Sequence, residues 1–204
     1  MSDAVIISLI SGTSSVCIAI ITVVIKTWLD ARSAAKKAAE DEGIHAEDLG
    51  EMIYIQEFVE NVREEFQLDR VSICQFHNGG KFLNGRSMKK FSMTYEATAL
   101  GIEKIKRKYQ NVLVSEFPKM VAAMLDKDFF IIDESISAEF PQAWREMMSN
   151  GIVQAVIVPI RGLRGDIMGF ISCHSIGEKN DLLGYHLRHD FSDRANQISG
   201  YLLK

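Results

Sequence analysis

Two apolar, β-branched runs in the last third of the chain constrain its fold more than any other feature. They cover residues 152–160 and 167–175, and a short connection with two glycines, 161–166, separates them. This pattern predicts an antiparallel hairpin. Because both runs are almost continuously apolar, we expect the hairpin to lie centrally in a sheet that is covered on at least one face.

The rest of the chain supplies strands and helices to surround this hairpin. Alternating or buried apolar patterns predict further strands over 70–77, 87–98 and 128–133, with Asn78-Gly79-Gly80 as the turn after the first. Apolar residues at helical spacing predict helices over 51–66, 140–149 and 182–203, and a helix capped by Ser115 with Pro118 in its first turn. This order predicts an α+β fold, an antiparallel sheet with flanking helices.

The N-terminal stretch predicts a membrane anchor. Residues 4–25 carry no charge, about the length that a helix needs to cross a bilayer. Positive residues follow the stretch, at Lys26, Arg32, Lys36 and Lys37, which places the C-terminal side in the cytoplasm. We therefore expect a single-pass anchor over 1–26 at the inner (cell) membrane, a helical stalk over 27–50, and a globular domain over 51–204. A soluble coiled coil or a helix buried in a virion is the alternative.

Composition limits the partners that the chain can have. The formal net charge is −4 and the pI is about 5.8, which argues against a broad phosphate-binding surface. We expect no nucleic acid partner. Small residues in the anchor, Ser8/Gly12 and Ser11/Ser15, have a spacing that allows close helix approach in lipid. A homo-oligomer held partly by the anchor is therefore expected.

Residues 150–160 and 165–172, together with 71–79, resemble the GAF-type sensor domain of the GAF/PAS superfamily. The likeness consists of a helix-ending glycine, a strand ending in Val158-Pro159, and a second strand around Gly169. It spans about 52–203. It implies a small-molecule pocket on the sheet face away from the terminal helices, and dimers that pack helices 51–66 and 182–203 in parallel. The polar set of cyclic-nucleotide-binding members is not recognisable.

Two metal or cofactor sites suggested by this sequence are not expected. The pair Cys173-His174 resembles the Cys-His of bilin-binding GAF members, but it falls on a predicted strand, so bilin attachment is not expected. Cys74 and His77 are expected to point to opposite faces of their strand, and so are Cys173 and His174. This alternation predicts cysteines in the core and histidines at its rim, and not one shared metal site. We expect neither a metal nor a cofactor.

A glycine-rich segment over 77–90 is the candidate ligand site. Its glycines bare the backbone N–H groups, which an anionic or polar ligand could approach, with an arginine as a forked donor. The candidate binding residues are His77, Asn78, Asn84, Arg86 and Ser87. The alternative is a structural hairpin whose glycines only permit tight turns. Glu96, Asp133 and the helical pair His186/Asp190 are weaker candidates.

These patterns favour a non-enzymatic, membrane-anchored cytoplasmic module that senses a small molecule. A ligand-free structural or interaction protein at the inner membrane, such as a phage could encode, is the alternative. A thiol enzyme using Cys74 or Cys173 is a third hypothesis. Neither cysteine has the basic, partly exposed surroundings that activate a thiol, so we expect no catalytic residue.

Overall fold

The computed structural model describes residues 23, 25–33, 46–81, 84–180 and 187–202. The chain divides into two compact units, Met1–Leu49 and Gly50–Lys204. Residues 25–33 of the first unit are helical. The predicted anchor and stalk lie mostly outside the described residues. Within the described part, no helix is both long and apolar enough to cross a membrane.

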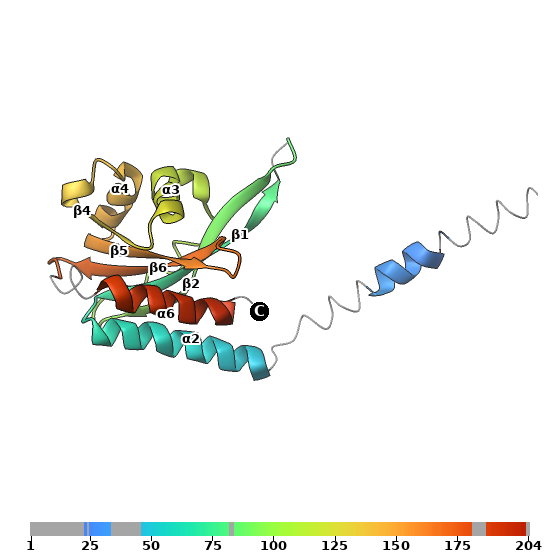
Figure 1. The fold of residues 1–204 in the computed structure, drawn as a ribbon, viewed down its shortest axis with the longest axis horizontal. Helices are drawn as coiled ribbons and strands as arrows, with labels where there is room; N and C mark the ends of the chain where they lie inside the picture. The colour runs from blue at the N-terminus through green and yellow to red at the C-terminus, as the bar shows by residue number, and fades with distance from the viewer. Residues whose placement is uncertain (1–22, 24, 34–45, 82–83, 181–186, 203–204) are drawn as a thin grey trace, which may run out of the picture. The chain divides into compact units, whose positions relative to one another are not determined.

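Among the described residues, six antiparallel strands form one sheet in the order β3-β2-β1-β6-β5-β4 (Figure 1). The predicted hairpin is confirmed, because β5 and β6 pair with Val156 opposite Cys173. β6 also pairs with β1, so the hairpin lies centrally, as expected. The strands are β1 (Arg70–Lys81), β2 (Ser87–Thr98), β3 (Val112–Leu113), β4 (Phe130–Asp133), β5 (Ile152–Arg161) and β6 (Ile167–Ile176).

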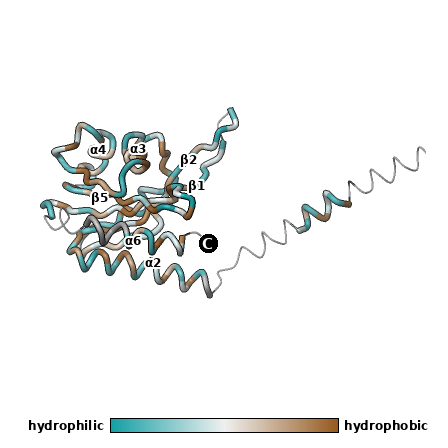
Figure 2. Tube along the Cα trace, viewed as in Figure 1, coloured by the Kyte–Doolittle hydropathy of each residue, from teal (hydrophilic) through white to brown (hydrophobic). Residues whose placement is uncertain are grey.

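Helices cover both faces of this sheet, which confirms the α+β architecture (Figure 1). Helices α2 (Ala46–Glu65) and α6 (Leu187–Leu202) lie on one face, and α3 (Pro118–Asp126) and α4 (Pro141–Ser149) lie on the other. Successive strand residues point to opposite faces. In β6, Ile171 and Cys173 therefore join the core under α2 and α6, and Phe170 joins the core under α3 and α4. The apolar residues gather in the layers between helices and sheet (Figure 2).

Two helix starts differ from the sequence prediction. Helix α2 begins at Ala46, and Met52 is 47% exposed although the pattern placed it in the buried stripe. Tyr201, near the end of α6, stacks on Tyr54 of α2. The part of α2 before Tyr54 therefore extends beyond the last described residues of α6. Ser115 does not cap α3: it lies in a short 3-10 helix, Val114–Glu116, and the capping position holds Phe117. Pro118 opens the helix as expected.

The first hairpin is longer than predicted. Asn78-Gly79-Gly80 is not a turn, because β1 continues to Lys81, which pairs with Ser87. A Cβ at Gly79 would lie 2.5 Å from the Lys90 side chain, so this lysine packs over the glycine within the strand. β6 pairs only with residues 70–75 of β1, and β3 pairs only with Lys90 and Phe91 of β2. Beyond these pairs the hairpin projects from the sheet (Figure 1). We call residues 76–81 and 84–92 the arm.

Candidate functional site

A cavity of about 70 Å³ lies between the sheet and helices α3 and α4. This is the face away from α2 and α6, where the family resemblance implied a pocket. Most of its wall is apolar, with three methionines, Met93, Met120 and Met147, from β2, α3 and α4. Four polar residues also reach it: Tyr109, Glu146, Ser172 and His174. The cavity therefore suits a small and largely apolar occupant.

Ser172 and His174 reach the cavity because of the strand period. Both lie on β6 at the same parity as Phe170, so their side chains point to the face of the sheet under α3 and α4. They are 5% and 6% exposed. Ser172 Oγ lies 2.6 Å from His174 Nε2. The strand thus places a hydrogen-bonded pair of polar side chains in an otherwise apolar wall.

Burial and the neighbouring Arg70 of β1 together set the protonation of this pair. Its Nη1 lies 3.5 Å from His174 Nδ1. Burial, together with the positive charge of Arg70, lowers the pKa of His174 to about 3, so the imidazole is neutral at pH 7. An arginine side chain can only donate, so Nδ1 must accept and Nε2–H donates to Ser172 Oγ. The Ser172 hydroxyl proton has no recorded acceptor among the described residues, and it can point into the cavity.

Arg70 is itself held by a buried ion pair. Its Nε lies 3.1 Å from Glu96 Oε1, and both side chains are almost fully buried. The Glu96 carboxylate also accepts hydrogen bonds from the N–H groups of Ile105 and Lys106, at 2.9 and 3.0 Å. Arg70 Nη2 donates to the carbonyl of Glu103 at 2.7 Å. The ion pair therefore fastens the loop over residues 99–111 to the sheet.

The same loop is fastened to α4 on the other side of the cavity. Tyr109 donates to Glu146 Oε1 at 2.7 Å, and Asn150 Nδ2 donates to the Tyr109 hydroxyl at 2.8 Å. Burial, followed by the bond to Glu146, raises the pKa of Tyr109, so it stays a neutral donor. Ile105 and Tyr109 of this loop line the cavity. The loop 99–111 thus forms part of the cavity wall and is held at two points.

The five predicted binding residues all lie on the arm, and none of them lines this cavity. The structure does bring some of them together. Ser87 Oγ donates to Asn78 Oδ1 at 2.9 Å, and Asn84 Oδ1 accepts from the Arg86 backbone N–H at 3.1 Å. His77 bonds instead to Ser92 Oγ, at 2.9 Å. A binding role for these residues stays a prediction, and it concerns a second, separate surface.

The cysteines and histidines of the described segments form no cluster that could hold a metal. Among the described residues, no group of three or more potential metal ligands comes together. Cys74 lies in the core on the cavity side and Cys173 in the core on the opposite side. Burial raises the pKa of both thiols. The prediction that His174 lies at the rim is wrong, because Arg70 and Ser172 give it polar partners inside the core.

The sequence patterns missed the polar group at the cavity. Periodicity does not mark Arg70 or Ser172 as site residues, and it marks Glu96 only weakly, because each stands in an apolar, strand-like run. The available signal was the side-chain period: residues 172 and 174 share a face, and β1 beside them presents residue 70 at the same parity. Pairing Arg70 directly opposite His174 requires the strand register, which the sequence did not supply.

Comparisons with known proteins give the fold. No protein-family model and no curated protein sequence matches the chain. The chain is similar to the blue-light-absorbing form of the PixJ GAF domain of Thermosynechococcus elongatus, at 16% identity and TM-score 0.59, over 78% of this chain and 89% of that one. It is also similar to the GAF domain region of a putative membrane protein of Geobacter sulfurreducens, at 17% identity and TM-score 0.52, over 76% and 94%.

A third similar structure is the chromophore-binding domain of the Stigmatella aurantiaca bacteriophytochrome, at 16% identity and TM-score 0.54, over 72% of this chain and 52% of that one. At these identities the likeness concerns the fold alone. The globular unit therefore has a GAF fold, with its antiparallel sheet and flanking helices.

Proposed function

We propose that this chain is a non-enzymatic regulatory module that senses a small, uncharged molecule in the cavity under α3 and α4. The observation that carries the proposal is a buried, neutral histidine–serine pair in the wall of an apolar cavity. Buried polar groups are costly unless they are hydrogen-bonded, and the Ser172 hydroxyl proton is left available. A ligand with one hydrogen-bond acceptor would use that proton.

The size and charge of the cavity limit the ligand. A cavity of 150 Å³ holds benzene, so a volume of about 70 Å³ suits about three or four non-hydrogen atoms. Most of the wall is apolar, so a charged ligand would lose its hydration there. His174 is neutral and Glu96 already balances the charge of Arg70, so neither residue compensates an anion. The ligand class is therefore a small neutral molecule with an acceptor such as a carbonyl. A chromophore, as in the bacteriophytochrome domain, is not proposed.

We further propose that the domain lies in the cytoplasm and is tethered to the inner membrane. This rests on the uncharged stretch over residues 4–25 and on the positive residues that follow it. Ligand binding would act through the packing of α2 and α6 on the other face of the sheet. A ligand shifts such an equilibrium only by binding the two states unequally.

Methionine-methyl NMR of the full-length chain in detergent micelles tests the sensing proposal. The probes are acetone, acetate and acetamidinium, which are similar in shape and differ in charge. We expect acetone alone to shift the methyl signals of Met93, Met120 and Met147, which line the cavity. Met52, which is exposed, and Met168 serve as internal controls. Equal responses to all three probes, or no response at the three cavity methyls, would contradict the proposal.

A ligand-free structural protein is the second candidate, and the small volume favours it. Ligand pockets are commonly about 300–1,000 Å³, well above the value of about 70 Å³ found here. Ala143→Leu from α4 would fill the space with side-chain atoms. If this variant gains stability while the NMR response to acetone is absent in the wild type, the cavity is a packing imperfection and the scaffold function stands.

A further inference from the structure

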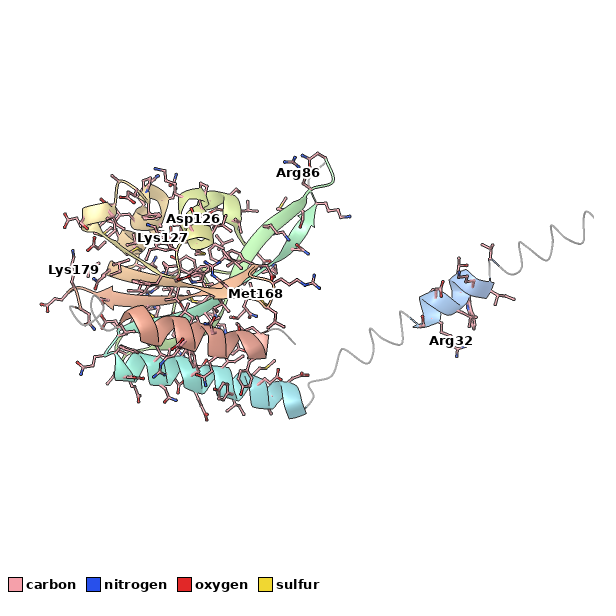
Figure 3. The ribbon with its side chains drawn as sticks, viewed as in Figure 1. Arg32, Arg86, Asp126, Lys127, Met168 and Lys179 are labelled. Atoms are coloured by element: carbon pink, nitrogen blue, oxygen red, sulfur yellow. The ribbon has the colours of Figure 1, made fainter. Side chains whose placement is uncertain are left out.

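The arm carries an unusual concentration of positive charge. From Arg70 to Tyr95 the sequence has no aspartate or glutamate, although the whole chain has a net charge of −4. Four cations lie on the arm: Lys81, Arg86, Lys89 and Lys90. Figure 3 shows Arg86 at the tip of the arm, away from the body of the domain.

Three of the four cations are exposed to solvent, and in the part of the chain that the structure describes none has a carboxylate partner. Lys81, Arg86 and Lys89 are exposed, and Lys90 is half-buried. Lys89 Nζ donates to Asn78 Oδ1 at 2.8 Å, which holds one ammonium on the arm. The arm is therefore an ordered ribbon with exposed positive charge.

The shape of the arm suits a macromolecular surface better than a small molecule. It is two-stranded, projects beyond the sheet, and contributes none of these four residues to the cavity (Figure 1). Beyond Gln75, β1 has no β6 partner. Such a ribbon can lie against a surface of opposite charge, where several cations act together.

A surface of opposite charge exists on α2 of the same chain. Glu57, Glu60 and Glu64 are exposed and spaced at i, i+3 and i+7, so they form one stripe along the helix. Like charges four residues apart disfavour a helix on its own. Within one copy, the Glu60 carboxylate accepts a hydrogen bond from the Gln56 side-chain amide at 2.9 Å. The Glu64 carboxylate forms an ion pair with Arg63 at 3.0 Å. A cationic partner would remove the remaining repulsion.

The direction of α2 makes this stripe accessible to another copy. Helix α2 runs opposite to β1, so it begins at the end of the domain from which the arm projects (Figure 1). The stripe lies in the C-terminal half of α2, toward the other end, so two copies side by side with their α2 helices in opposite directions bring the arm of each to the stripe of the other. Ile53, 50% exposed and on the same face of α2, adds apolar surface there.

We propose that the arm docks on the acidic stripe of α2 in a second copy of this chain. In a two-fold symmetric pair this contact occurs twice, because each copy supplies one arm and one stripe. The contact is electrostatic and exposed, so it weakens as salt is raised. It does not depend on the cavity or on its ligand.

A charge exchange between the two surfaces tests the proposal in the full-length chain. One variant carries Arg86→Glu, Lys89→Glu and Lys90→Glu, and the other carries Glu57→Lys, Glu60→Lys and Glu64→Lys. We expect each variant alone to self-associate at least tenfold more weakly than the wild type in sedimentation experiments in detergent micelles. An equimolar mixture of the two variants restores both contacts, and hetero-pairs form with nearly wild-type affinity.

The matched control changes three exposed cations on the loop 99–111: Lys104→Glu, Arg107→Glu and Lys108→Glu. It introduces the same charge change as the arm variant, and self-association is expected to stay at the wild-type level. Restoration in the mixture also shows that both variants are folded. The proposal is overturned if the mixture does not pair, if the arm variant pairs like the wild type, or if the control weakens pairing equally. It is also overturned if the arm variant loses only binding to phosphatidylserine vesicles or duplex DNA.

Discussion

At the residue scale, a chain of buried polar groups runs from Glu96 through Arg70 and His174 to Ser172. Each member is fixed by the next, and the last one reaches the cavity. A buried charge without its partner is costly, so the ion pair is expected to fix the arrangement more than it stabilises the fold. The buried Arg70–Glu96 pair differs in this respect from the exposed ion pairs of the domain.

Removing the carboxylate of Glu96 leaves Arg70 charged and buried. We expect Glu96→Ala to lower the free energy of unfolding by about 3–5 kcal/mol. The control is Glu65→Ala, which breaks the 2.6 Å pair between Glu65 and Arg194, both partly exposed. That change is expected to cost less than about 1 kcal/mol. Urea denaturation measures both, and equal losses would show that the Arg70–Glu96 pair is not buried.

His174 predicts a pH dependence of stability. In the unfolded chain the imidazole takes up a proton near pH 6.5, whereas in the folded chain its pKa is about 3. Between these values the unfolded state binds more protons, so lowering the pH destabilises the fold, by up to about 1.4 kcal/mol per pH unit. His174→Gln should flatten this slope between pH 6 and 4. Equal slopes in wild type and His174→Gln contradict a buried neutral imidazole.

At the element scale, the sequence predicted the strands better than their connections. The hairpin of β5 and β6, the strand β2 and the short β4 follow from apolar periodicity, which directly reflects burial. The length of β1 did not follow, because Asn78, Gly79 and Gly80 are typical turn residues. The cavity could be placed only through the resemblance, because its polar residues meet through strand register.

The register between β1 and β6 leaves no room for a side chain at Gly169. A Cβ at this position would lie 2.2 Å from the Cys74 carbonyl oxygen on β1. We therefore expect Gly169→Ala to lower the free energy of unfolding by about 1–3 kcal/mol or more, because β1 and β6 must separate.

The matched control is Gly50→Ala in α2, where no atom lies within 4 Å of the added Cβ. Since alanine favours a helix, this change is expected to raise stability by about 0.5–1 kcal/mol. Thermal denaturation compares the two variants. A tolerated Gly169→Ala would mean that β1 and β6 are not paired in this register.

At the scale of the whole molecule, the GAF fold separates two surfaces with different chemistry. The cavity side presents a largely apolar space with a few polar wall residues, and the arm presents exposed positive charge. The sheet joins them, because β1 supplies Arg70 at one end and the arm at the other. We infer that β1 takes part in both proposed activities. Arg70 connects it to ligand sensing, and the arm connects it to self-association.

The cavity is the feature on which the account rests, and its most direct test is a crystal structure of the full-length chain under xenon pressure. Xenon is uncharged and binds apolar cavities of suitable size. The account predicts a xenon atom between α4 and the sheet, close to Met147 and Ala155, and its loss in Ala143→Leu. A wild-type structure in which side chains fill this space and no xenon binds would contradict the account.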